Sequence, residues 1–469
     1  MQTPPGLLKM PPSVNLISST KPRRWLLILS VGVAFALVAA VFLLTIGLKK
    51  HSLRVRIAER IAFLQEAGVP TTAAELDLLF QPPPAQSNSA PLYSAAVASL
   101  VGPGKFGDWP FITLSTFPFR TQRMPQTELD AMAAYSKSNQ PVLALLHQAA
   151  RIEDGLYPTG FKNGFGLTSP LTPLSSFRTA AQLLALTAVG HAEQGQPDAA
   201  VASINDLFGL ARSLKHSPEA VSQMVRVAFM GLGVSATEID LNQTTLTDAQ
   251  LRDLSLALGK TDAPDAIQRI LNTVRCRAIW RYQTGLAWGG ATPPTFLERA
   301  RANLDRLGYS RDADFLDFFD YLDRQIATGK LDYPKRLEAE ITLALAAQDR
   351  FVNSLEFSST AHTMNSVFLG VARGQAVIEL GQTALALERW RLVHENQLPE
   401  SLTNLVPAFL PTVPIDPFNG RPLRYKKLAQ GYSLLSLGPD SAPNASRLRT
   451  SIYSTTNSTP SDISFTVGR

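Results

Sequence analysis

The apolar pattern of the chain begins with one long uncharged run, residues 25–48, rich in Leu, Val, Ala, Ile and Phe. Two arginines directly precede this run and two lysines directly follow it. A bilayer core of about 30 Å needs roughly 20 apolar residues, so the run can span a membrane with some tilt. A cleaved secretory signal has a shorter apolar stretch and a small-residue exit. The pattern therefore predicts an uncleaved transmembrane helix at 25–48, after a short cytoplasmic tail at 1–24.

Helical periodicity continues beyond the apolar run. Apolar residues recur from Leu53 to Leu64 at spacings of four, four and three, which is typical of an amphipathic helix. Thr72 and Glu75 have the spacing of a capping box that opens the next helix. We therefore expect juxtamembrane helices over residues 49–81.

The middle of the chain, residues 82–360, predicts a bundle of helical hairpins. Several prolines stand where a first helical turn is expected, because proline lacks only an N–H group that is unpaired there. Each is followed by a single apolar stripe with helical period, and Thr247 and Gln250 form a second capping-box pattern. The prolines are Pro141, Pro173, Pro197 and Pro218.

Residues 361–440 predict a long helix followed by a small α/β element with a short antiparallel sheet. Asp416 can accept backbone hydrogen bonds in a turn, Pro417 fixes φ, and Gly420 supplies a permissive backbone. Alternating positions from Arg421 to Lys426 and from Tyr432 to Ser436 predict two paired strands. The full turn motif comprises Pro414, Asp416, Pro417, Gly420, Tyr425, Gly438 and Asp440.

This order of helix, proline-bounded loop, Asp-Pro turn and small sheet resembles the C-terminal part of the major pseudopilin of type II secretion. The start of the ectodomain, around Gly68, Glu75, Asn88 and Tyr93, resembles uncharacterised membrane-anchored bacterial proteins that end in such a segment. The resemblance implies the fold of the segment and an extracytoplasmic location. Pseudopilins can hold calcium with acidic groups near the last strands, but Asp440 has no second carboxylate close by, so we expect no metal.

The final residues, 441–469, are rich in Ser and Thr and poor in apolar side chains. Such a composition cannot bury enough apolar surface to offset the entropy of ordering the chain. We therefore expect a disordered tail. The fold class predicted for the whole chain is mainly α.

The formal charge of +6 is concentrated near the predicted membrane helix. Residues 1–60 hold nine of the 44 Lys and Arg but only one of the 38 Asp and Glu. The rest of the chain is therefore close to neutral, and the basic character belongs to the membrane flanks, where each cation near an anionic leaflet contributes about 1 kcal/mol. Net charge gives no case for nucleic-acid binding.

Motif searches identify no catalytic residue, cofactor site or metal site. Zinc-protease, nucleophile-elbow, Walker A and dinucleotide patterns do not occur, and no two of the six histidines have helical metal-ligand spacing. Cys276, the single cysteine, has no histidine nearby in sequence and is interpreted as a half-buried helical residue.

A series of aspartates is the best candidate for acid-base or metal chemistry. Carboxylates three apart on a helix lie close together, but the same pattern is typical of a solvated helix face. We favour the solvated face, with an internal salt-bridge network to a neighbouring basic helix. The aspartates are Asp312, Asp314, Asp317, Asp320 and Asp323; the arginines are Arg269, Arg275, Arg277 and Arg281. Separately, Gly370 and Gly374 have the small-residue spacing that lets another helix approach closely.

An aromatic segment between residues 101 and 126 interrupts the helical pattern. A loop of this length and composition is either a binding loop or a cover over the core. Both interpretations stay open. Its candidate contact residues are Phe106, Trp109, Phe111, Phe117 and Phe119.

The side of the membrane is decided by two opposing arguments. Slightly more cations follow residues 25–48 than precede them, which favours a cytoplasmic domain by the positive-inside rule. A long domain after the anchor can nevertheless translocate despite such a small difference, and N-terminal anchors commonly export the domain attached to them. We predict a single-pass protein of the bacterial inner membrane with its large domain in the periplasm.

The sequence thus favours a membrane-anchored binding or scaffold protein of the envelope over an enzyme. Its predicted partners are the lipid bilayer, through residues 25–48, and an unknown envelope protein. The alternative is an envelope hydrolase whose carboxylates converge from distant helices. A cytoplasmic adaptor would follow only from the inverted topology.

Overall fold

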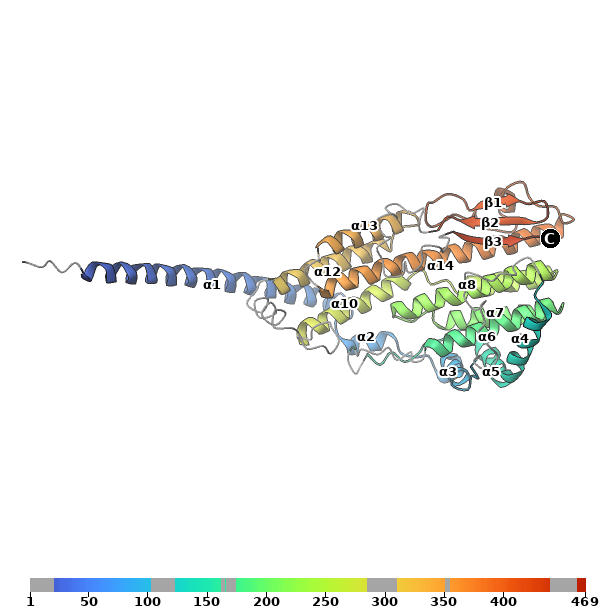
Figure 1. The fold of residues 1–469 in the computed structure, drawn as a ribbon, viewed down its shortest axis with the longest axis horizontal. Helices are drawn as coiled ribbons and strands as arrows, with labels where there is room; N and C mark the ends of the chain where they lie inside the picture. The colour runs from blue at the N-terminus through green and yellow to red at the C-terminus, as the bar shows by residue number, and fades with distance from the viewer. Residues whose placement is uncertain are drawn as a thin grey trace, which may run out of the picture. The chain divides into compact units, whose positions relative to one another are not determined.

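The structure is a computed structural model that describes residues 21–102, 123–161, 165, 174–284, 310–350, 355–438 and 462–469. Its contacts divide the chain into two compact units: residues 1–60 with 293–313, and residues 61–292 with 314–469. The described residues are mainly α-helical, with one small antiparallel sheet (Figure 1).

Among the described residues, the helices up to Gln243 are α1 (Lys21–Glu66), α2 (Ala73–Leu79), η1 (Ala85–Ser87), α3 (Ala90–Ala98), α4 (Gln126–Ser138), α5 (Gln140–Ala150), α6 (Leu174–Glu193), α7 (Pro197–Ser213) and α8 (Ala220–Gln243). The later elements are α9 (Asp248–Gly259), α10 (Ala266–Thr284), α12 (Ser310–Thr328), α13 (Lys335–Arg350), α14 (Leu355–Val393), η4 (Leu402–Leu405), β1 (Arg424–Lys427), β2 (Tyr432–Ser436) and β3 (Ile463–Val467).

Helix α1 is long and apolar enough to cross a membrane, and its apolar half is exposed. Most of the described side chains between Trp25 and Leu48 face outward, including Phe35 and Phe42. The helix continues without a break to Glu66, so the predicted membrane and first juxtamembrane helices are one element. Beyond the apolar half, Arg54 pairs with Asp312 at 3.4 Å within the first unit.

The two predicted capping boxes of the second unit are confirmed. The hydroxyl of Thr72 accepts the backbone N–H of Glu75, whose carboxylate in turn accepts the backbone N–H of Thr72. Thr247 and Gln250 form the same reciprocal box at the start of α9. Each box satisfies two backbone donors that the helix itself leaves unpaired.

Pro197 is the first residue of α7 and Pro141 the second residue of α5, as predicted. The prediction for Pro218 is wrong, because α8 begins two residues later, at Ala220, and Pro173 lies outside the described residues.

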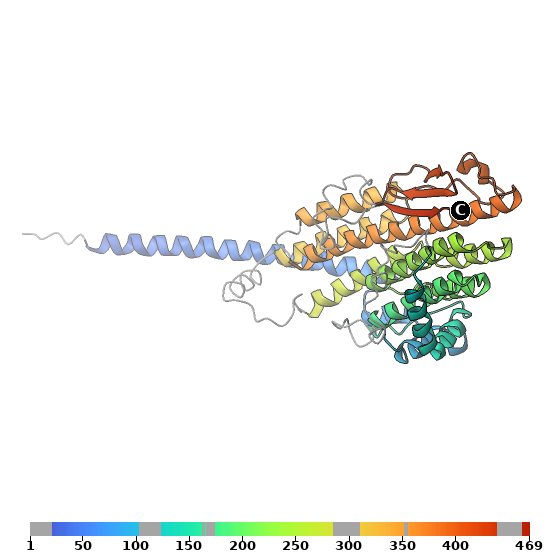
Figure 2. The ribbon, with the colours of Figure 1, turned by 45° about the vertical axis from the view of Figure 1, so that its right-hand side comes forward.

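Helix α14 is the element on which most of the second unit is arranged. Helices α8, α9 and α13 pack along it, and β2 and β3 lie against its later part (Figures 1 and 2). The contact with α8 is close because Gly374 has no side chain: a Cβ atom there would lie 2.8 Å from a methyl group of Val227. A Cβ on Gly370 would collide with Met224 in the same way. The predicted close approach at these two glycines is therefore confirmed.

The three-stranded sheet has the order β1-β2-β3, and both pairings are antiparallel. The first hairpin agrees with the prediction of two strands within residues 421–436. The prediction of a disordered tail over 441–469 is wrong for its last part, because residues 463–467 form β3. Long-range contacts explain the error. Phe465 and Val467 are buried, β3 contacts α8 and α14, and the backbone N–H of Thr466 donates to Glu238 of α8.

The Asp416 turn joins the two halves of this small element. Its buried carboxylate accepts hydrogen bonds from the backbone N–H groups of Phe418 and Leu437 and from the hydroxyl of Ser436. The hydroxyl of Tyr425 donates to the carbonyl of Pro399 at 3.0 Å. These residues of the turn motif thus have structural partners.

Gly431 provides a test of the close contact between the β1–β2 turn and β3. It has a φ of +75°, and a Cβ atom there would collide with the backbone carbonyl of Val467 in β3. We expect Gly431→Ala to lower the free energy of unfolding by about 2 to 4 kcal/mol, from left-handed strain and overpacking. Gly68→Ala is the control, because Gly68 has a similar φ with nothing near its missing Cβ, and should cost about 1 kcal/mol. Denaturant unfolding of the purified full-length protein in detergent measures both, and equal losses would contradict the collision.

Asp240 on α8 provides a second test, through pH. Burial raises the pKa of its carboxyl from 3.8 to about 6. A 2.7 Å hydrogen bond from Thr244 and the charge of Arg469 lower the pKa but do not offset the effect of burial. Because the folded-state pKa lies above the unfolded one, its stabilising contribution is complete below about pH 4 and lost as pH rises through 6. Asp240→Asn should remove up to about 3 kcal/mol of this pH dependence.

The measurement is the free energy of unfolding of the wild type and of Asp240→Asn at pH 4 and at pH 7. Burial also raises the pKa of Asp206 to about 6. The stability of the Asp240→Asn variant should therefore still decrease somewhat between pH 4 and pH 7. Asp253→Asn, an exposed position on α9, is the control and should follow the wild type. If the free energy of unfolding changed equally with pH in Asp240→Asn and in the wild type, the raised pKa of Asp240 would be contradicted.

Candidate functional site

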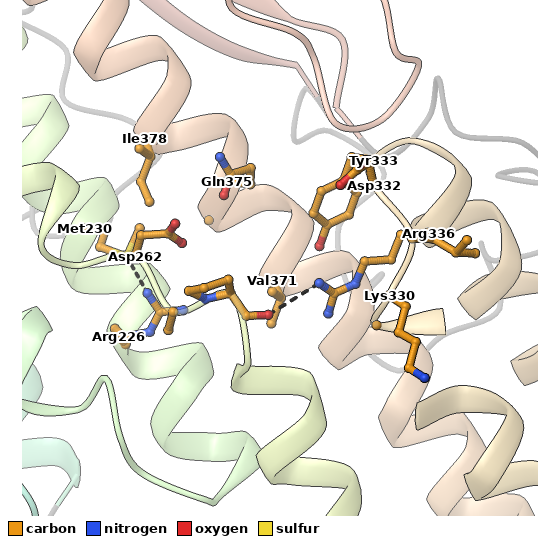
Figure 3. Close-up of a pocket in the computed structure, with 15 residues that line it drawn as sticks. Arg226, Met230, Asp262, Lys330, Asp332, Tyr333, Arg336, Val371, Gln375 and Ile378 are labelled. Carbon is orange, nitrogen blue, oxygen red and sulfur yellow. Dashed lines mark hydrogen bonds between the residues drawn. The ribbon is translucent and has the colours of Figure 1, made fainter. Parts of the chain in front are cut away.

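The candidate site is a pocket of about 260 Å³ inside the second unit. Helix α8 supplies one wall together with residues 260–265, the connection between α9 and α10. Residues 329–334, between α12 and α13, supply the opposite wall with the start of α13, and α14 passes between the two (Figure 3). Four segments that are distant in sequence therefore converge on one hollow.

Arg226 is the most unusual group in the pocket wall. Its side chain is 3% exposed, on a helix whose neighbouring positions are apolar. Nε donates to the side-chain carbonyl of Gln223 at 2.8 Å, and Nη1 donates to the backbone carbonyl of Thr261 at 2.6 Å. Neither acceptor carries a charge. Burial lowers the pKa of this guanidinium to about 10, which still leaves it cationic at neutral pH.

Asp262 lies beside Arg226 on the same wall, as Figure 3 shows. Its charge acts on Arg226, since it opposes the lowering of the arginine pKa. Within the described residues, however, the two side chains do not form an ion pair, and the second terminal nitrogen of Arg226, Nη2, has no hydrogen-bond acceptor. The wall thus presents a guanidinium and a carboxylate side by side. Each has hydrogen-bonding atoms that the other does not occupy.

Arg336 and Tyr333 stand on the opposite wall. Nε of Arg336 donates to Glu340 at 3.0 Å, and its guanidinium lies 5.4 Å from the centre of the Tyr333 ring. The Tyr333 hydroxyl is buried without a partner among the described residues. Burial raises the pKa of Glu340, while its ion pair with Arg336 opposes this. Lys330 and Asp332 are exposed at the rim.

Local sequence explains how the second wall is shaped. Helix α12 ends in overlapping turns in which the N–H groups of Gly329, Lys330 and Leu331 donate to carbonyls three residues earlier. The carbonyl of Asp332 then accepts the N–H of Arg336 and starts α13. The short connection therefore places Lys330, Asp332 and Tyr333 together at the pocket.

A separate histidine–carboxylate pair occurs between α5 and α7. Nδ1 of His147 lies 3.0 Å from both carboxylate oxygens of Asp206, and Nε2 lies 3.1 Å from the guanidinium of Arg151. Because arginine only donates, Nε2 is the accepting nitrogen and Nδ1–H faces Asp206. Arg151 thus occupies the lone pair that a general base would need. This pair also lies outside the pocket.

The structure separates the aspartate series on α12 into ion pairs. Asp323 pairs with Arg275 of α10 at 3.0 Å, which confirms part of the predicted network between these helices. Asp314 and Asp317 pair instead with Arg350 of α13, a partner that the sequence did not indicate. Within the described ranges, no three His, Cys, Asp or Glu side chains lie close enough together to hold a metal ion.

Cys276 is more deeply buried than its pattern indicated. The thiol donates to the carbonyl of Pro70 at 2.9 Å, and burial raises its pKa to about 12. Since the thiolate is the reactive form, this cysteine is inert at neutral pH.

Several sequence-based candidates fall outside the described residues. The aromatic loop with Phe106, Trp109, Phe111, Phe117 and Phe119 is one, and Asp440 of the turn motif is another. None of the remaining turn-motif residues lines the pocket, although Gly420 lies against the ring of Pro334, the residue after the lining residue Tyr333.

The pocket itself was missed at the level of sequence, although one signal for it exists. Arg226 interrupts a run of apolar residues from Met224 to Met230, so its side chain falls on a buried helix. A lone cation in an apolar stretch indicates either an internal ion pair or a binding group. No pattern along the chain indicates the other wall, because its residues meet Arg226 only through the fold.

Comparisons with known protein families, curated protein sequences and solved structures give no match to this chain. The site must therefore be interpreted from its own chemistry.

The buried Arg336–Glu340 pair makes the pocket wall testable. Both side chains are buried, so Arg336→Met would strand the Glu340 carboxylate and should lower the free energy of unfolding by about 3 to 5 kcal/mol. The double variant Arg336→Met/Glu340→Leu should recover most of this loss, because no unpaired charge remains. Thermal unfolding at pH 7 compares the three proteins. A single variant as stable as the wild type would show that the pair is not desolvated.

Proposed function

We propose that this protein is a membrane-anchored, extracytoplasmic binding protein of the bacterial envelope. The observation that carries the proposal is the combination of an exposed apolar helix at residues 25–48 with a folded body whose pocket holds a buried guanidinium that no described carboxylate hydrogen-bonds. Burying a charged group without a hydrogen-bonded counter-ion is costly, and a ligand that supplied the carboxylate would lower this cost.

Two features support the periplasmic side. Residues 361–438 form a long helix, a turn around Asp416 and an antiparallel hairpin, in the order expected from the pseudopilin resemblance. The second is the length of the domain that follows the anchor, since a long domain can translocate regardless of the flanking charges. A scaffold role, with an envelope protein on the helical surface, is compatible with the same placement.

One observation favours the alternative, an envelope hydrolase. Asp262 and Asp332 come from separate connections and line the same pocket, so two carboxylates do converge from distant parts of the chain. General acid-base work needs one carboxyl whose environment holds it protonated and a second that stays ionised. Asp332 is exposed at the rim and is not enclosed by apolar side chains. Binding therefore remains the better-supported function.

The proposed location can be tested with the buried cysteine as an internal blank. Because Cys276 is buried and its thiol is protonated at neutral pH, wild-type protein should not react with a membrane-impermeant maleimide. Asp253→Cys places a thiol at an exposed position of α9, and Gln2→Cys places one before the anchor. In spheroplasts, we expect only Asp253→Cys to be labelled, and Gln2→Cys to be labelled after lysis.

Both variants should sediment with membranes and resist extraction by alkaline carbonate. Labelling of Gln2→Cys in intact spheroplasts, with Asp253→Cys protected until lysis, would place the body in the cytoplasm and reject the proposed location. Recovery of the protein in the soluble fraction would reject the anchor.

A further inference from the structure

The geometry of the pocket points to a ligand class: we propose that it binds a small zwitterion of the α-amino acid type. Its carboxylate would bind Arg226, and its ammonium group would bind Asp262. This inference rests on the proposed binding role and deepens it by naming the chemistry of the ligand.

The first step is the unfilled capacity of Arg226. The side chain is 3% exposed, and the described residues include no carboxylate hydrogen-bonded to it. Two of its nitrogens are held by Gln223 and Thr261, which fix the plane of the guanidinium. Nη2 keeps its two N–H groups without an acceptor among the same residues. A fixed guanidinium with donors to spare is well suited to a carboxylate, because its donors match the carboxylate oxygens in geometry and charge.

The second step is the neighbouring carboxylate. Asp262 stands next to Arg226 on the same wall, so a carboxylate that can accept from an ammonium group lies beside the guanidinium (Figure 3). The other charged residues of the lining are Lys330, Asp332 and Arg336. An α-amino acid carries its ammonium and carboxylate groups on one carbon atom, so its head group needs an anion and a cation side by side. Arg226 and Asp262 supply that pair without satisfying each other by an ion pair.

The third step is the rest of the cavity. Met230, Val371 and Ile378 add apolar surface near the two charged residues, while Lys330 and Tyr333 lie opposite (Figure 3). An apolar or mixed side chain of the ligand would therefore have a surface to contact. The volume of about 260 Å³ lies just below the usual range for ligand pockets, which limits the ligand to a small molecule.

A purely structural role for Arg226 is the competing explanation. In that case the guanidinium only ties α8 to residues 260–265 through the Thr261 carbonyl, and Asp262 is a solvated charge nearby. The two explanations differ in one respect. A structural arginine gives no reason for the protein to distinguish an amino acid from the same molecule without its amino group.

The experiment is isothermal titration calorimetry on the full-length protein in detergent at pH 7. The probes are L-leucine, 4-methylpentanoate, which lacks the amino group, and 3-methylbutylamine, which lacks the carboxylate. We expect L-leucine to bind at least tenfold more tightly than either analogue. In Asp262→Asn, the preference for L-leucine over 4-methylpentanoate should fall close to one, while Asp253→Asn, at an exposed site outside the pocket, should keep it.

Arg226→Gln should lose binding of L-leucine and of 4-methylpentanoate together. Because this variant removes a buried hydrogen-bonding group and can unfold, Val371→Phe provides a second route: it keeps both charges, fills the cavity and should also abolish binding. Each variant is first checked for the wild-type circular dichroism spectrum.

Two results would overturn the inference. One is equal binding of L-leucine and 4-methylpentanoate, unchanged in Asp262→Asn. The other is no binding of any probe to folded wild-type protein. If Asp253→Cys is labelled in spheroplasts as expected, either result rejects the ligand class and leaves the envelope location standing.

Discussion

The close approach of α8 to α14 is the constraint on which the rest of the second unit depends. It exists because Gly374 leaves room for Val227 and Gly370 leaves room for Met224. Two helices that touch at such positions cannot slide along or turn about each other without a collision. The other helices and the sheet then pack on surfaces whose relative position is already fixed.

The pocket is a direct consequence of this contact. Arg226 precedes Val227 on α8, and Gln375 follows Gly374 on α14, so residues that line the pocket are sequence neighbours of the residues in closest contact. The backbone segments that carry Arg226 and the α14 side chains are therefore in close contact with each other. Close packing matters for binding, because a preorganised charged group needs no ordering when a ligand arrives.

Several buried charges elsewhere in this unit are paired, and Arg226 differs from them. Glu388 receives hydrogen bonds from the guanidinium groups of Arg391 and Arg469, and Glu340 receives one from Arg336. Glu238 on α8 accepts the backbone N–H of Thr466 in β3, which connects the last strand to the helices. The fold thus supplies partners for these buried carboxylates, whereas in the pocket Arg226 has no hydrogen-bonded carboxylate among the described residues.

The sequence by itself determined the elements that depend on neighbours along the chain. The uncharged run at residues 25–48 is long enough to require a helix, and the capping boxes at Thr72 and Thr247 set helix starts through contacts three residues apart. The Asp416 turn and the first hairpin follow from the same short-range chemistry. The glycine spacing in α14 also indicated a close helix contact, although not its partner.

Tertiary structure decided everything that depends on distant residues. Strand β3 exists because α8, α14 and β2 bury Phe465 and Val467, and the segment that contains it has no compositional sign of order. The arginine partners of the α12 aspartates come from three different helices. Arg226 and Asp262 become one site only when α8 packs against the connection that follows α9. The physical reason is that the interactions of a buried charge depend on which acceptors and counter-ions the fold places next to it.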